Sequence, residues 1–246
     1  MTFEALVIQN RTGGRGGGIE AWDMTTSNIE VLNNQFLSNA YNGILVGSED
    51  GGYIHTNWMV KNNRVEDNGF AGIELTNAQS STIMRNDIDG GVFGIVVQAR
   101  NTVVGSGLVT IDGVHVLHNT VDNAAAYGIY VLSYTGVQTD PFDPITGASI
   151  LLTSVSVSHN TVTDSGGAGI LFWAYNEGAT AKNGRIMKNV LDCPSTPGIM
   201  VLERSTSGPT GTVENVKVVN NTFGNCNPAF TNEGEDTKYP PGPPLP

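Results

Sequence analysis

Four residues with side chains suited to proton transfer and to carboxylate binding occupy the same place in a repeated phrase. Arg85, His118, His159 and Lys188 each directly precede an asparagine that recurs along the chain. A cation beside a uronate carboxylate neutralises it and acidifies the adjacent C–H, and a histidine can then remove that proton. If the fold stacks these positions, they would suit elimination or epimerisation at a uronate. We predict His118 and His159 as base and acid, with Arg85 and Lys188 as the cations.

Further residues suited to contact a sugar polymer fall on neighbouring outward positions. This face holds six of the twelve Lys and Arg residues and three of the four histidines, although the chain has a net charge of −11. Tyrosine and tryptophan rings offer sugar-stacking surfaces on a second strand. The expected binding residues are His115, Arg185, Lys61, Arg64, Tyr130 and Trp173.

A plainer interpretation of the cations stays open. Glu66, Asp89, Asp122 and Asp192 each follow a recurring asparagine by three residues and could pair with the basic side chains. Surface ion pairs of that kind contribute little to stability and do not indicate a site. The histidines show no metal-ligand spacing, so we expect neither a metal nor another cofactor.

The element that must position these residues is a two-part phrase. An apolar-x-apolar-x-x-Asn-x-apolar run is followed, eight or nine residues after its Asn, by Gly-Ile-x-apolar. Constant internal spacing with variable distance between copies is typical of a solenoid with insertions at one corner. The copies are Asn10/Gly18, Asn34/Gly43, Asn63/Gly72, Asn86/Gly94, Asn119/Gly128, Asn160/Gly169 and Asn189/Gly198, and Asn221 opens an eighth copy without Gly-Ile.

Two repeat folds fit the first half of the phrase, and the second half separates them. A leucine-rich repeat continues into a helix, whereas Gly-Ile-x-apolar alternates with period two. We therefore predict an all-β, right-handed parallel β-helix solenoid of about eight coils over residues 1–230, with the Asn column turned inward as a ladder. In the first copy Ala5 and Val7 are expected inward and Asn10 in the ladder. Residues 231–246 read as a Pro-rich tail or linker.

These repeats resemble those of the right-handed parallel β-helix, pectin-lyase-like superfamily. That resemblance implies proteins such as polysaccharide lyases, C5-epimerases, pectin-type hydrolases and phage tailspikes. It implies an extracellular protein that binds an acidic, uronate-containing polysaccharide and cleaves or epimerises it. A non-catalytic adhesive or structural segment, such as a tailspike or surface fibre, is the alternative. Of the epimerase motif Tyr-Gly-Phe-Asp-Pro-His only Phe142, Asp143 and Pro144 match.

Composition and the pattern of outward residues limit which partners we expect. An acidic chain is a poor partner for nucleic acid, and no apolar run reaches the length of a membrane span. The outward positions of the Gly-Ile strand from Val96 onward are mostly apolar, so we expect the insertion at 133–153, or a second copy in a homo-oligomer, to cover them. Open coil ends offer another self-contact. Cys193 and Cys226 fall in consecutive coils, where either a disulfide or two free thiols is expected.

Overall fold

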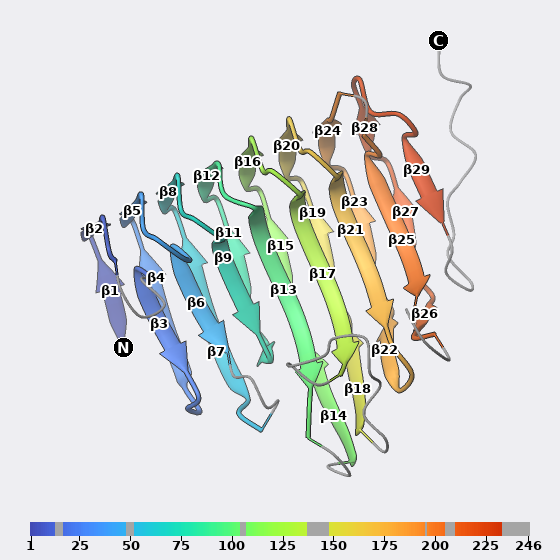
Figure 1. Cartoon of the computed structure of the whole chain (residues 1–246), viewed down its shortest axis with the longest axis horizontal. Coiled ribbons are helices and arrows are strands. Elements are labelled where there is room, and N and C mark those ends of the chain that lie inside the picture. Colours follow the sequence, from blue (N-terminus) through green and yellow to red (C-terminus); the bar gives the residue numbers. More distant parts are fainter. Residues whose placement is uncertain are drawn as a thin grey trace.

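The chain folds into a stack of coils whose strands form long parallel sheets. The computed structural model describes residues 1–12, 17–47, 52–103, 107–136, 148–194, 196–204 and 210–232. Figure 1 shows the strands advancing from the N-terminal to the C-terminal end, and all pairings between named strands are parallel. No α-helix occurs in the described part of the chain. The predicted all-β, right-handed parallel β-helix is confirmed.

Three sheets run the length of the stack. Sheet A comprises β1 (Thr2–Glu4), β4 (Ser27–Leu32), β7 (His55–Lys61), β11 (Thr82–Met84), β15 (His115–Leu117), β19 (Ser156–Ser158), β23 (Arg185–Met187) and β27 (Lys217–Val219), with β10 (Ala78–Gln79) beside β7. Sheet B comprises β2 (Val7–Gln9), β5 (Gln35–Leu37), β8 (Arg64–Glu66), β12 (Asp87–Asp89), β16 (Thr120–Asp122), β20 (Thr161–Thr163), β24 (Val190–Asp192) and β28 (Thr222–Phe223). Sheet C comprises β3 (Ile19–Trp22), β6 (Ile44–Gly47), β9 (Ala71–Thr76), β13 (Phe93–Asn101), β17 (Tyr127–Thr135), β21 (Ala168–Tyr175), β25 (Ile199–Arg204) and β29 (Phe230–Asn232).

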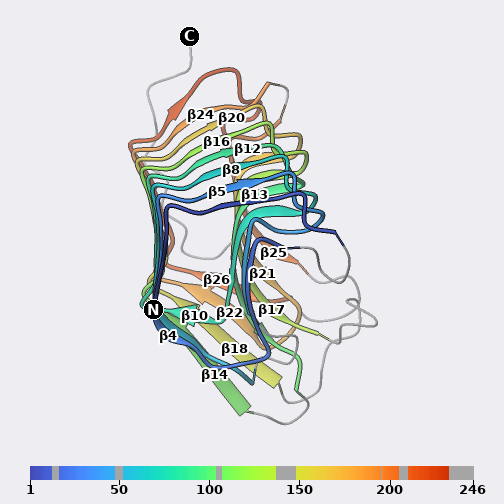
Figure 2. The same cartoon turned by 90° about the vertical axis from the view of Figure 1, so that its left-hand side faces the viewer.

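A fourth, shorter sheet closes the wider coils. Sheet D comprises β14 (Gly107–Asp112), β18 (Ala148–Thr153), β22 (Ala179–Lys182) and β26 (Thr212–Glu214). In Figure 2 it lies opposite sheet B, at the far side of the coils. Segments that the repeat pattern leaves as insertions after the Gly-Ile strand thus become strands, because their alternating apolar residues, such as Ile150 and Leu152, also enter the core.

The asparagine ladder forms as predicted. Each Nδ2 group donates to the Oδ1 atom of the next asparagine at 2.9–3.1 Å, from Asn34 through Asn63, Asn86, Asn119, Asn160 and Asn189 to Asn221. The same Oδ1 atoms also accept from the backbone N–H of the preceding asparagine. Buried amides without such partners would cost stability, so the column satisfies its own polar groups.

The glycine of each Gly-Ile pair is needed for close packing. A Cβ atom on Gly72 would lie 2.7 Å from Cγ2 of Ile88 and 2.8 Å from the carbonyl oxygen of Gly94. Gly43 is as crowded, by Val65 and the carbonyl of Gly72. Sheet B side chains therefore pack directly onto the backbone of sheet C, which leaves no room for a side chain.

The first and last coils differ from the predictions. β1 pairs with β4 and β2 with β5, which places Leu6 rather than Asn10 beside Asn34, and the N–H of Leu6 donates to Asn34 at 2.9 Å. The inward residues are Phe3 and Ile8, not Ala5 and Val7, since Ala5 takes the corner position. At the other end the pattern continues, because β29 pairs with β25 and completes an eighth coil.

Candidate functional site

The four residues predicted to be catalytic lie side by side at the corner between sheets A and B. The backbone N–H groups of Arg85, His118, His159 and Lys188 each donate to the next coil, so the four occupy one column in consecutive coils. All four side chains are exposed. The imidazole rings of His118 and His159 stack, with centroids 4.8 Å apart and planes inclined by 24°. We call these four residues the corner column; their catalytic roles stay predictions.

The corner column stands on a strained backbone position. Its φ angles are 54° at Arg85, 55° at His118, 57° at His159 and 55° at Lys188. Other coils place Asn33, Asn62 and Asn220 at this position, with the same left-handed backbone. Asparagine and histidine tolerate this conformation better than most residues, whereas arginine and lysine gain no local hydrogen bond to offset a cost of about 1–2 kcal/mol. Two of the four middle coils thus carry a cation where asparagine would be more stable.

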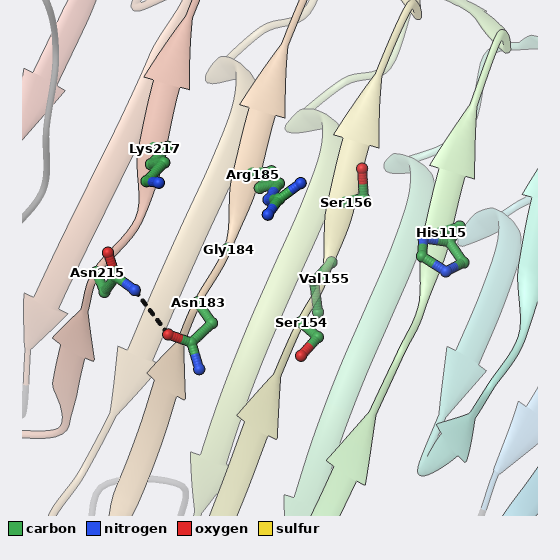
Figure 3. A pocket seen from close by; sticks show the side chains of 9 residues that line it. All are labelled: His115, Ser154, Val155, Ser156, Asn183, Gly184, Arg185, Asn215 and Lys217. Carbon is green, nitrogen blue, oxygen red and sulfur yellow. Dashed lines mark hydrogen bonds between the residues drawn. The ribbon is translucent and has the colours of Figure 1, made fainter.

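A groove runs beside the corner column on the outer face of sheet A. The strand register aligns His115, Ser156, Arg185 and Lys217 on neighbouring strands, as Figure 3 shows. The groove has a volume of about 440 Å³. Its further wall is formed by Ser154, Val155, Asn183, Gly184 and Asn215. We call it the basic groove, and it brings together two of the predicted binding residues, His115 and Arg185.

Two other predicted binding cations lie apart from the basic groove. Lys61 is in β7, in register with Met84 rather than with the groove column. Arg64 begins β8 in sheet B and forms an ion pair with Glu66, whose hydrogen bond and charge raise the pKa of Arg64. Arg64 is therefore engaged with a carboxylate.

Glu66 is one of the four carboxylates that follow a ladder asparagine by three residues. The other three, Asp89, Asp122 and Asp192, form no ion pair with the corner column within the described residues. The amide of Asn123 donates to Asp89 at 2.9 Å, and the hydroxyl of Thr163 donates to Asp122. Asp192 accepts two hydrogen bonds from Asn225, each of 2.8 Å. Within the described residues Arg85, Arg185, Lys188 and Lys217 form no ion pair. The interpretation in which the acidic column neutralises the basic one holds only for Arg64 and Glu66.

Aromatic side chains form a continuous file along sheet C. The rings of Tyr41 and Phe70 stack at 4.9 Å between centroids, and Phe70 meets Phe93 edge-on at 5.1 Å. Phe93 lies 5.5 Å from Tyr130, which lies 6.3 Å from Trp173. These rings come from successive coils, so a file of aromatic surfaces follows the axis of the stack.

A second groove, of about 350 Å³, opens beside this file. It is lined by Trp22, Tyr41, Phe70, Glu74, Phe93, Val96, Gln98, Arg100, Tyr130 and Leu132, and we call it the aromatic groove. The carboxylate of Glu74 accepts from the Asn42 amide at 2.8 Å and from the Thr76 hydroxyl at 3.2 Å, so it is held in place.

Arg100 differs from Glu74 in that its side chain has no polar partner among the described residues. Its guanidinium lies 5.6 Å from the centre of the Tyr134 ring, and its buried Nε atom has no hydrogen-bond partner. A buried donor without a partner is costly unless a ligand or water supplies one. Arg100 is thus the group of the aromatic groove best suited to a ligand oxygen.

The predicted stacking residues lie on this face. Tyr130 lines the aromatic groove, and burial among neighbouring tyrosines raises its pKa, so it stays a neutral phenol. Trp173 is half-buried and packs on Tyr130 and Tyr175, and its buried indole N–H has no partner within the described ranges. The apolar outer strip is largely covered, since Val96, Leu132, Leu171 and Leu202 are buried. Most of the insertion expected to cover it, residues 137–147 with Asp143, lies outside the described residues.

The cysteines are adjacent and free. The backbone N–H of Cys193 lies 3.1 Å from Sγ of Cys226, and both side chains are buried. Hydrogen bonding to Cys226 and burial raise the pKa of Cys193, so this thiol stays protonated. Of the two expected states, the structure has the free thiols.

The described residues hold no group of three or more His, Cys, Asp or Glu side chains that could bind a metal ion. Within them no helix has the length and apolar character needed to cross a bilayer.

Sequence reasoning missed Tyr41, Phe70, Phe93 and Arg100. A signal existed, because an aromatic residue stands one or two positions before the glycine in four consecutive copies, at Tyr41, Phe70, Phe93 and Tyr127.

Comparisons with known proteins bear on the fold. Residues 2–141, more than half of the chain, match the family described as right handed beta helix region. Among curated proteins no match was found.

Two solved structures of similar fold share 13% sequence identity with the chain. A tailspike protein double mutant of Escherichia coli bacteriophage HK620, in complex with a pentasaccharide, has a TM-score of 0.54 over 90% of this chain and 42% of the tailspike. The A-module of a mannuronan C-5 epimerase from Azotobacter vinelandii has a TM-score of 0.43 over 87% of this chain and 65% of the module. The chain thus spans less than two thirds of either structure.

Proposed function

The chain belongs to the right-handed β-helix family, and on this premise we propose that it binds a polysaccharide in the aromatic groove. The observation that carries the proposal is the file of rings from Tyr41 through Phe70 and Phe93 to Tyr130. Ligand sites are concave and mainly apolar, with a few polar groups that fix orientation. The aromatic groove has this composition, with Glu74, Gln98 and Arg100 as the polar groups.

The length of the groove suits a chain rather than a single sugar. Its lining residues begin at Trp22 in the first coil and end at Leu132 in the fifth. Coils repeat about every 4.8 Å, so the groove extends roughly 19 Å along the axis. The HK620 tailspike structure holds a pentasaccharide, which supports the view that this scaffold can accommodate an extended glycan. A protein that binds such a polymer would act outside the cell or on a virion.

A uronate-bearing glycan is the ligand class that Arg100 favours. Its guanidinium has no carboxylate partner in the part of the chain that the structure describes, and a planar fork of donors suits a carboxylate of the ligand. Glu74, by contrast, is already hydrogen-bonded to Asn42 and Thr76 and would accept sugar hydroxyls.

Cleavage or epimerisation of the polymer is the second candidate function. It is favoured by the stacked His118 and His159 rings with Arg85 and Lys188 on either side. That column lies at the corner of sheets A and B, away from sheet C, so binding and turnover would use different faces. The two candidates can therefore be tested by separate variants.

An array of polysaccharide fragments tests the binding proposal. Wild type should bind one class of glycan, and the Phe93→Leu/Tyr130→Leu variant should bind it roughly five- to a hundredfold more weakly, because each aromatic contact contributes about 0.5–1.5 kcal/mol. Tyr53→Leu removes an exposed ring that does not line the groove and serves as the control. Absence of binding to every glycan, or equal binding by the groove variant, would overturn the proposal.

A further inference from the structure

The chain leaves its last strand in line with the aromatic groove. Strand β29 lies at the edge of sheet C, the sheet that carries the groove. The register of sheet C aligns Asn232, the final residue of β29, with Val131 and Val97. The next position along those strands holds Leu132 and Gln98, which line the groove. The sequence that follows Asn232 therefore departs from sheet C at the height of the groove.

The composition of that following sequence suits an aromatic surface. An acidic run at 233–236 comes first, Lys238 follows it, and five of the eight residues at 239–246 are proline. Proline-rich sequences favour the polyproline II conformation before they bind, so they lose little conformational entropy on docking. Grooves lined by aromatic rings are the surfaces that recognise them. The aromatic groove offers such rings from Tyr41 to Tyr130.

We propose that residues 239–246, which we call the proline segment, bind in the aromatic groove of their own chain and compete there with the polysaccharide. The docking depends only on the groove, and the competition rests on the function proposed above. A bound proline segment would cover the rings of Phe70, Phe93 and Tyr130, so a glycan would have to displace it. The proposal thus adds a means of regulation to the same groove.

The number of residues matches the path that they must cover. Strand β13 lies four strands from β29, which is about 19 Å at roughly 4.8 Å per strand. Residues 233–238 can span up to about 20 Å when extended, so they reach β13. From β13 the groove continues over three more strands to β3, or about 14 Å. The proline segment covers that distance, because eight residues of polyproline II extend about 25 Å.

The order of charges in the sequence also matches the groove. A segment that runs from β29 toward β3 meets Arg100 in β13 before it meets Glu74 in β9. The acidic run at 233–236 would come near Arg100, whose buried Nε atom has no hydrogen-bond partner among the described residues. Lys238 would come next, near the carboxylate of Glu74. Each charge thus approaches one of opposite sign, which favours this direction over the reverse.

A tethered segment needs only modest intrinsic affinity to occupy the groove. A short linker gives an effective concentration on the order of 1 mM. If the untethered peptide binds with a Kd of about 0.1 mM, the segment fills the groove in roughly nine of ten molecules, and any added ligand binds about tenfold more weakly. This difference can be measured on the full-length chain.

The first measurement uses a fluorescent synthetic peptide with the sequence of residues 238–246. Its Kd is determined by anisotropy for the wild type and for the full-length variant Pro240→Ser/Pro241→Ser/Pro243→Ser/Pro244→Ser. The variant should bind the peptide about tenfold more tightly than wild type does, because its own segment no longer fills the groove. Equal affinities would overturn the inference.

A second pair of variants locates the peptide in the groove. Phe93→Leu/Tyr130→Leu, added to the serine variant, should weaken peptide binding roughly five- to a hundredfold, since two aromatic contacts are lost. Tyr53→Leu, added to the same serine variant, removes an exposed ring outside the groove and should leave the Kd within about twofold. Equal losses in the two would show that the peptide binds elsewhere and overturn the inference.

Photo-cross-linking tests the docking without changing the groove. Tyr239→p-benzoylphenylalanine in the otherwise wild-type chain should give an intramolecular adduct within strands β9, β13 or β17 or the residues directly before them, as mapped by mass spectrometry. Adducts only on other sheets, or only between two chains, would overturn the inference. Neither measurement contains a glycan. A protein that binds no glycan can therefore still confirm the docking, and a protein whose segment does not dock can still bind a glycan.

Discussion

The imidazole rings of His118 and His159 stack with their centroids 4.8 Å apart, the distance between neighbouring coils. Their ring edges therefore face the same side of the stack, one coil apart, rather than opposing each other across a cleft. A sugar chain along the column would meet one ring after the other. This geometry decides how their predicted catalytic roles can be tested.

If the two histidines act as base and acid on one sugar, each should be indispensable. His118→Ala, His159→Ala and the double variant should then lose turnover by a similar factor, about 10²–10⁴, because residues that act as a unit are not additive. The measurement is formation of unsaturated product, or epimerised product by NMR, from a uronate polymer. Single variants that retain most of the activity would rule out the acid–base pair.

The close packing at the glycines between sheets B and C predicts that an added side chain there lowers stability. Gly72→Ala would force its Cβ within 2.7 Å of Ile88 and should destabilise the fold by about 1–3 kcal/mol, as overpacking does. Gly52→Ala is the matched control, since nothing lies within 4 Å of a Cβ there. Thermal melting of both variants checks this. Equal melting temperatures would show that the sheets separate more easily than the structure indicates.

The contribution of a ladder asparagine to folding stability should depend on its place in the stack. Asn119 is buried and bonds to neighbours on both sides. Asn119→Ala removes the acceptor of the Asn86 backbone N–H and the side-chain donor to the Ile83 carbonyl, and should cost about 1–3 kcal/mol. Asn221 is the last rung and is half-buried, so Asn221→Ala should cost less. Chemical denaturation gives both values. A larger loss at Asn221 would contradict the ladder account.

Lowering the pH should decrease the stability of the fold because of His55. Burial lowers the pKa of His55, against a smaller opposing effect of the Gly47 backbone, and the ring pairs with the Thr26 hydroxyl at 2.6 Å. The folded state therefore binds a proton less readily than the unfolded chain. Stability should fall as pH drops below about 6.5, the usual value for histidine, and level off below the folded pKa. His55→Phe should flatten the dependence of melting temperature on pH between about 7 and 5. Parallel curves for variant and wild type would exclude His55 as the cause.

The repeat pattern of the sequence predicted the features that recur in every coil, and it missed the features that occur in only some coils. The Asn and Gly-Ile columns recur in nearly every coil, so their inward faces and the stacking of His118 on His159 could be foreseen. The first coil lacks a ladder asparagine, and Asn10 matched the pattern by chance while Leu6 took the position. Sheet D was missed because β14 and β18 lie outside the phrase. The aromatic groove depends on residues such as Phe70, which directly precedes β9, and Phe93, which begins β13, and the directions of these rings are fixed by packing between coils.

The central claim, that a glycan lies in the aromatic groove, is tested most directly by a crystal structure of the protein with an oligosaccharide found on the array. We predict sugar rings stacked on Phe70, Phe93 and Tyr130, with a ligand oxygen within hydrogen-bond distance of the Arg100 guanidinium. An oligosaccharide bound only on another face, with the aromatic groove filled by solvent, would contradict the account.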